Sequence, residues 1–145
     1  MPLTYPATDV LIALSGRESR LSYDLMVFEP SVAPRRPDVF LEWYHDQTNW
    51  AESHSYNDPK VTSPSLAGWF FEMIKNFPPM NGPFRSDNPD DSRVTDYSIG
   101  STVIYAAFAW SEAEVAYSDV RRLAVKHHVG FFDVSGNSEI VFPPA

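Results

Sequence analysis

The chain has 145 residues, the usual length of one domain, and a chain of this size buries roughly two thirds of the surface that its unfolded form exposes. It contains no cysteine, which excludes disulfides, thiolate metal sites and cysteine nucleophiles and indicates a reducing, cytoplasmic environment. Nineteen acidic residues against eleven basic ones give a formal net charge of -8, which argues against nucleic acid and anionic lipid as ligands and favours a cationic partner.

Residues 1–21 have no clear pattern, and we expect them to form an N-terminal extension, with residues 22–145 as a single domain. The apolar run at residues 10–14 is too short for a signal peptide or a membrane span, so we expect neither secretion nor membrane insertion. Aromatic and β-branched side chains at residues 23–28 predict the first strand, which ends before Pro30 because proline cannot donate to a sheet ladder.

Two helices are expected next. Apolar residues recur at helical spacing over residues 38–44, whereas residues 46–60 lack this period and are predicted to be a long loop. The second helix has a capping residue in Ser63 and a favourable first residue in Pro64. Its apolar side chains share one face, and the prolines at 78 and 79 end it.

A polar connection at residues 81–92 separates these helices from two further strands. The strands cover residues 94–99 and 102–109, and the turn at residues 100–101 makes them a hairpin. The second strand has no charged side chain, so we expect it in the centre of the sheet.

The last helix has the most explicit start signal, because residues 111–114 read Ser-Glu-Ala-Glu, the form of a capping box. Cationic side chains at residues 126–128 fall in its final turn, where the helix dipole favours them, and Gly130 suits the C′ position. Residues 131–134 and 139–142 then predict a terminal hairpin.

The resulting order is β-α-α-β-β-α-β-β, and it predicts an α+β fold. The economical form of that order is a ferredoxin-like sandwich, in which an antiparallel sheet carries its helices on one face.

No catalytic motif is present, since the chain lacks a G-x-S-x-G elbow, a P-loop and a G-x-G-x-x-G loop. His45, Asp46, His54 and Asp58 are close in sequence, but their spacing matches no metal-binding pair, so they are interpreted as surface polar groups. We therefore expect no catalytic residue, no metal ion and no cofactor. A composite site assembled from distant residues stays open as an alternative.

The segment from residue 38 to residue 58 differs from an ordinary surface. It has five acidic residues and no Lys or Arg, and aromatic side chains lie between the acids. Aromatic anchors and carboxylates together suit an interface with a cationic protein, although Trp43 and Tyr44 are also explained as core residues of the first helix. The predicted partner-binding residues are Asp46, Trp50, Glu52, His54, Tyr56 and Asp58.

Several segments resemble a family of small, uncharacterised bacterial proteins over about residues 22–142. They read YDLMVFEP at 23–30, FPPMNGP at 77–83, TDYSIG at 95–100, VIYAAFAWS at 103–111 and VGFFDVS at 129–135. Some members of that family lie beside genes for polymorphic or contact-dependent toxins, so the resemblance implies an immunity protein. It implies no site residues.

Three functions are therefore considered. The first is a cytoplasmic immunity or inhibitor protein that binds and neutralises a cationic toxin domain. The second is a small-molecule-binding or enzymatic ferredoxin-like domain, with a pocket between sheet and helices that Tyr97, Tyr105, His45 and His54 would line. The third is an interaction module that forms a homodimer through its sheet or an edge strand.

Overall fold

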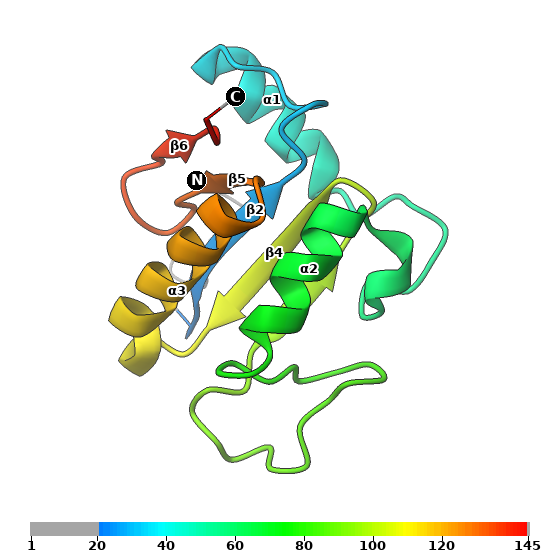
Figure 1. The fold of residues 1–145 in the computed structure, drawn as a ribbon, viewed down its shortest axis with the longest axis vertical. Coiled ribbons are helices and arrows are strands. Elements are labelled where there is room, and N and C mark those ends of the chain that lie inside the picture. Colours follow the sequence, from blue (N-terminus) through cyan, green and yellow to red (C-terminus); the bar gives the residue numbers. More distant parts are fainter. Residues whose placement is uncertain (1–20, 145) are drawn as a thin grey trace.

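The computed structural model describes residues 21–144, which form a five-stranded antiparallel sheet with helices on both faces (Figure 1). The predicted extension lies outside these residues, apart from Leu21. Within residues 21–144 no helix has both the length and the apolar character needed to cross a membrane.

The sheet is built around one strand that is buried on both faces. This strand, β2 (Tyr23–Phe28), pairs antiparallel with β4 (Val103–Phe108) on one side and with β5 (Gly130–Phe132) on the other. The hairpin partner of β4 is β3 (Asp96–Ile99), and β6 (Ile140–Val141) pairs with β5 at the opposite edge. The strand order is β3-β4-β2-β5-β6.

The first core lies between the sheet and two helices, α2 (Pro64–Met73) and α3 (Ala113–Lys126). Leu25 and Val27 of β2 point into it, because alternate residues of a strand face the same side. Trp69 joins the two helices, since its indole N–H donates to the carbonyl oxygen of Val120 at 3.2 Å.

The second core lies on the opposite face of the sheet, under α1 (Pro37–Gln47). Met26 and Phe28 point into it from β2, and the Phe28 and Phe40 rings lie 5.0 Å apart. Trp43 and Tyr44 also pack against this core, as their helical spacing predicts.

The α+β class is therefore confirmed, and the helices and strands follow the predicted succession. The prediction that all helices lie on one face of the sheet is wrong, because α1 covers the face opposite α2 and α3. A strand buried on both faces needs apolar cover on both sides, and the apolar residues at 23–28 are the cause. Because of this third layer, the simple ferredoxin-like sandwich is not established.

Two helix starts show how local signals compete with tertiary contacts. Ser63 caps α2 as predicted, since its hydroxyl accepts the Leu66 N–H at 3.2 Å. The capping box at 111–114 is wrong, because a short 3-10 turn, η3 (Trp110–Glu112), precedes α3 and no side chain caps that helix. Ser111, the expected capping residue, lies inside this turn, and the neighbouring Glu112 carboxylate accepts a hydrogen bond from Arg93 at 2.9 Å.

The end of α3 also differs from the prediction, because His128 and not Gly130 has the left-handed conformation, with φ of 57°. Gly130 begins β5, where a Cβ would lie 2.2 Å from the Phe28 ring. The glycine is needed there for close packing and not as a helix terminator.

Candidate functional site

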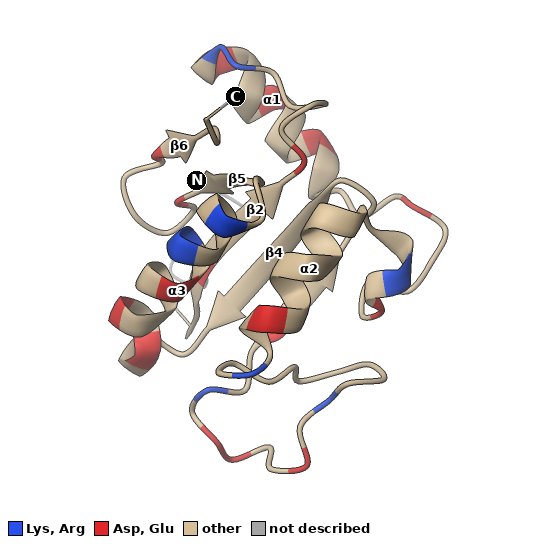
Figure 2. Cartoon of the chain, in the orientation of Figure 1, with Lys and Arg blue, Asp and Glu red and all other residues tan. Residues whose placement is uncertain are grey.

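Acidic side chains form a stripe along α1, visible as the red segments of that helix in Figure 2. Asp38, Glu42 and Asp46 are four residues apart, which places them along one side of an α-helix, and all three are exposed. Asp38 forms a salt bridge with Arg36 at 2.8 Å, whereas Glu42 and Asp46 have no salt bridge to any residue in 21–144. We call Asp38, Glu42 and Asp46 the acidic ridge.

The position of Asp46 is unfavourable for the helix itself. It lies in the last turn of α1, where the helix dipole is negative and a carboxylate is disfavoured by about 0.3–1 kcal/mol. Its carboxylate forms no salt bridge with any residue in 21–144, and burial lowers the pKa of His45, the basic residue in the same turn. Local helix stability therefore does not explain this charge.

The loop after α1, residues 48–58, is fastened to the sheet through Tyr56. The Tyr56 carbonyl oxygen accepts the N–H of Ile99 at 2.7 Å. Its hydroxyl accepts the Glu52 N–H at 2.6 Å and donates to the Glu52 carbonyl oxygen at 3.1 Å. These bonds give the loop a fixed shape without secondary structure of its own.

Glu52 and His54 form an ion pair that is tied to the β3–β4 turn. The Glu52 carboxylate accepts hydrogen bonds from the N–H of Ser101 at 3.0 Å, from its hydroxyl at 2.9 Å and from the imidazole of His54. Partial burial raises the pKa of Glu52, but these hydrogen bonds outweigh it and the pKa lies below its ordinary value.

The surroundings of the His54 ring favour its charged form. Its Nδ1 faces the Ser55 carbonyl oxygen at 2.7 Å, and its Nε2 faces the Glu52 carboxylate. Because both partners are acceptors, both ring nitrogens are satisfied only when each carries a proton. The hydrogen bond to Ser55 and then that to Glu52 raise the pKa of His54 above 6.5.

Trp50 turns the chain inward after α1. Its φ is 52°, a left-handed conformation that is uncommon for a bulky residue. The indole packs against the Tyr56 ring at 5.1 Å and the Tyr105 ring at 6.2 Å, and it joins the second core as a half-buried residue. Its first contribution is therefore to the packing of the loop.

Asp58 ends the loop and caps the short 3-10 helix η2 (Pro59–Val61). Its carboxylate accepts the N–H of Lys60 at 3.0 Å and lies 3.8 Å from the Lys60 ammonium. The structure thus brings Trp50, Glu52, His54 and Tyr56 together as one loop, and places Asp46 and Asp58 at its two ends. Partner binding by these six residues stays a prediction.

The four residues considered for a small-molecule pocket do not meet. Tyr97 is buried in the first core, where its hydroxyl donates to the Phe77 carbonyl oxygen at 2.8 Å. Tyr105 packs on the second core, on the opposite face of the sheet. His45 is exposed on α1, and His54 belongs to the loop.

A polar pair that the sequence patterns did not single out lies on the α1 side of the sheet. Tyr105 donates to Oδ2 of Asp24 at 2.5 Å, and Ser22 donates to Oδ1 at 2.7 Å. Burial raises the pKa of Asp24, and these hydrogen bonds offset only part of that effect. Burial also raises the pKa of Asp96. Asp24 of β2 and Asp96 of β3 both pair with Ala107 of β4, one from each neighbouring strand.

Two exposed aromatic residues were also missed. Phe71 is 42 % exposed on α2, and Phe84 is 44 % exposed in the loop that follows, with their ring centroids 5.2 Å apart. The helical pattern does indicate that Phe71 is exposed, because this residue falls outside the apolar face of α2. Nothing in the sequence indicates that Phe84 lies beside it.

Among residues 21–144, no group of three or more His, Asp or Glu side chains has an arrangement that could hold a metal ion. Comparisons with protein-family models, curated proteins and solved structures gave no match for this chain. The likeness to small bacterial proteins therefore stays a prediction, and the functional argument depends on the surface of the molecule alone.

Proposed function

We propose that this protein is a cytoplasmic immunity protein that binds and neutralises a cationic bacterial toxin domain through the acidic ridge. The observation that carries this proposal is the pair Glu42 and Asp46, two exposed carboxylates without a salt bridge to any described residue, on a helix whose dipole disfavours the second of them. A partner that supplies Lys or Arg would satisfy both charges.

The surroundings of the ridge support a binding role. The helix is anchored by Phe40, Trp43 and Tyr44 in the second core, so its charges are held on a rigid support. The loop of residues 48–58 is pre-ordered by Tyr56 and by the Glu52–His54 ion pair. A rigid, pre-formed surface loses little conformational entropy on binding.

Charge reversal on the ridge tests the proposal. The gene neighbourhood is first searched for a cationic toxin domain, and the double variant Glu42→Lys/Asp46→Lys should weaken binding to such a domain by at least tenfold, mainly through slower association. The measurement is surface plasmon resonance at two salt concentrations, and the wild-type affinity should fall as salt rises. The double variant Asp87→Lys/Glu114→Lys is the matched control, because both residues are exposed and lie outside α1. Equal losses in the two double variants would contradict the proposal.

Substitutions within the loop are less informative. Trp50→Ala removes part of the second core, and a change at Glu52 breaks its bonds to Ser101 and His54. Either change disturbs the shape of the loop as well as any contact with a partner. The ridge variants separate these effects, since Glu42 and Asp46 point into solvent.

A small-molecule-binding or enzymatic ferredoxin-like domain is the second candidate. Two helices on one sheet face and the β3–β4 hairpin support the ferredoxin-like relation, and the Asp24–Tyr105 pair supports chemistry on the other face. A carboxyl group with a raised pKa is a common feature of general acids and bases. Ligand-induced shifts in the NMR signals of Asp24 and Tyr105, on screening with small-molecule mixtures, would favour this candidate over the first.

A further inference from the structure

The long connection between α2 and β3 extends beyond the ends of both elements, and it contains an exposed asparagine, Asn81, that is followed by Gly82 (Figure 1). Around this pair the chain closes on itself, because the N–H of Ser86 donates to the carbonyl oxygen of Pro79 at 2.8 Å. We call residues 79–86 the Asn81 loop.

Asparagine is a thermolabile residue, because the main chain can convert it to an acid in two steps. The backbone nitrogen of the next residue forms a bond to Cγ, the bond between Cγ and Nδ2 breaks, and ammonia leaves with the proton that the nitrogen loses. Water then opens the five-membered ring at either of its carbonyl groups, which gives aspartate or isoaspartate. The first step needs a free side-chain amide and a following N–H that no hydrogen bond holds, and a side chain on the following residue hinders it.

Asn81 meets all of these requirements. No residue in 21–144 forms a hydrogen bond with the Asn81 side chain or with the Gly82 N–H, and Gly82 has no side chain to hinder the attack. The fold itself requires glycine at this position. Gly82 has φ of 89°, and a Cβ there would lie 2.2 Å from the Asn57 carbonyl oxygen. The close contact with Asn57 therefore keeps a glycine directly after an exposed asparagine.

The other asparagines of the chain each lack at least one requirement. In three of them the following N–H already donates to a carbonyl oxygen, at 2.8–3.5 Å: Asn49, Asn76 and Asn137. Asn88 is followed by Pro89, which has no N–H. The side-chain amide of Asn57 accepts a hydrogen bond from Ser55 at 3.2 Å, and an aspartate follows it. The structure thus distinguishes Asn81 from every other asparagine.

The isoaspartate product does not fit the present loop. Isoaspartate continues the main chain through its side-chain carboxyl carbon, so the link from residue 81 to Gly82 becomes one carbon–carbon bond longer and a negative charge is added. Gly82 has no room to move towards Asn57. Phe84, two residues later, packs with its ring 6.3 Å from the Phe70 ring and 5.2 Å from the Phe71 ring. A longer link therefore displaces Phe84 or separates Gly82 from Asn57.

We propose that Asn81 is a deamidation site of the folded protein, and that isoaspartate at position 81 detaches the Asn81 loop from Asn57 and from the rings of α2. The reaction consumes only water and releases only ammonia. Because the loop after α1 ends beside Asn57, the modification alters the support of that loop as the protein ages. The proposal does not depend on toxin binding, since it involves no residue of the acidic ridge.

Peptide mapping tests the site. The full chain is incubated at mildly alkaline pH and digested with trypsin, and a sample digested without incubation corrects for conversion during digestion. Cleavage after Lys75 and Arg85 releases residues 76–85, a single peptide that contains Asn81 and, as an internal control, Asn76. Mass spectrometry should show conversion at Asn81 at least tenfold faster than at Asn76, and within tenfold of the rate in a synthetic peptide of the same residues. A rate outside either limit would overturn the proposal.

Two variants complete the test. Asn81→Gln should gain no negative charge in the same incubation, because its longer side chain would have to form a six-membered ring, and a charge gain that persists in this variant would place the reaction elsewhere and overturn the site. Asn81→Asp carries the new charge on an ordinary main chain.

The purified isoaspartate form should have shifted ¹H–¹⁵N signals at Asn57, Phe71 and Phe84 and should unfold at a lower urea concentration than the wild type. Asn81→Asp should keep the wild-type signals at Asn57 and Phe71. Equal shifts in the two proteins, or none in the isoaspartate form, would overturn the detachment of the loop.

Discussion

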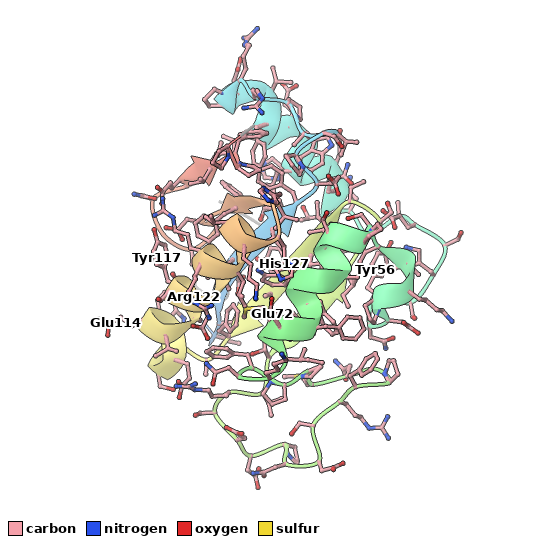
Figure 3. The ribbon with its side chains drawn as sticks, viewed as in Figure 1. Tyr56, Glu72, Glu114, Tyr117, Arg122 and His127 are labelled. Carbon is pink, nitrogen blue, oxygen red and sulfur yellow. The ribbon has the colours of Figure 1, made fainter. Side chains whose placement is uncertain are left out.

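Gly68 of α2 lies directly against the imidazole of His127 on α3, and a Cβ at position 68 would be 2.9 Å from Nδ1 of that ring. The other ring nitrogen, Nε2, lies 2.5 Å from the carboxylate of Glu72, one turn further along α2. Figure 3 shows Glu72 and His127 in the space between the two helices. A glycine inside a helix costs about 1 kcal/mol relative to alanine, and here it makes room for an interhelical hydrogen bond.

Gly68→Ala should consequently destabilise the protein in spite of its better helix propensity. The added methyl group displaces the His127 ring, and overpacking of this kind costs about 1–3 kcal/mol, so the net loss should be about 1 kcal/mol. In a His127→Ala background the same change should instead stabilise the protein by about 0.5–1 kcal/mol. Urea unfolding of the four proteins measures both effects, and an equal effect in both backgrounds would contradict this account.

Glu72 should contribute to acid denaturation. Hydrogen bonds from Lys126 and then from His127 lower the pKa of Glu72 from 4.5 to about 2. Because this carboxyl group has a lower pKa in the folded state, its stabilising contribution is complete above about pH 4.5 and is lost as the pH falls towards 2. Glu72→Gln should therefore flatten the decrease in unfolding free energy between pH 5 and pH 2, whereas Glu114→Gln, an exposed residue labelled in Figure 3, should not.

The Glu52–His54 ion pair predicts the opposite dependence on pH. The pKa of His54 is raised above 6.5, so the stability from its protonated ring is present below about pH 6.5 and is lost as the pH rises through the higher, folded-state pKa. An NMR titration of the His54 ring should give that raised pKa, and Glu52→Gln should lower it. Glu114→Gln serves as the control. A His54 pKa that Glu52→Gln leaves unchanged would show that the ion pair is absent in solution.

Much of the fold is predictable from local patterns. The strand at 23–28 and the Ser63 cap of α2 appear as the sequence indicates, because both signals act over a few neighbouring residues. The capping box at 111–114 fails because Ser111 lies inside the 3-10 turn η3 and not at the N-cap of α3. That turn contacts residues distant in sequence, since the Trp110 ring lies 5.2 Å from the Tyr23 ring and Glu112 binds Arg93. The side of the sheet that α1 covers also depends on distant residues, since Phe40 packs against Phe28.

The candidate sites are predictable only in part. The acidic ridge follows from helical spacing, because residues four apart share one side of a helix. The contact between Phe71 and Phe84 does not, because Gly82 and Asn57 must first bring two loops together. The hydrogen bond between Ser101 and Glu52 likewise joins residues far apart in sequence, and no local sequence pattern predicts it.

Asp24 gives the last prediction. Burial raises the pKa of its carboxyl group above the ordinary 3.8, so the charged form is disfavoured in the folded state in spite of the hydrogen bonds from Tyr105 and Ser22. Because the folded-state pKa of Asp24 is higher than the ordinary 3.8, its carboxyl group destabilises the folded protein increasingly as the pH rises from 3.8 to the folded-state pKa. Above the folded-state pKa this destabilisation is complete.

Asp24→Asn should therefore be more stable than the wild type at pH 7, and its advantage should decrease towards pH 4. Tyr105→Phe should have the reverse effect, since it leaves the carboxylate with one donor fewer, and a hydrogen bond to a charged group contributes about 1.5–3 kcal/mol. Urea unfolding at the two pH values measures both variants. If Asp24→Asn loses stability at pH 7, the carboxylate is a structural requirement of β2. If it gains stability, the chain retains a destabilising charge on this sheet face, which is a common cost of a functional group.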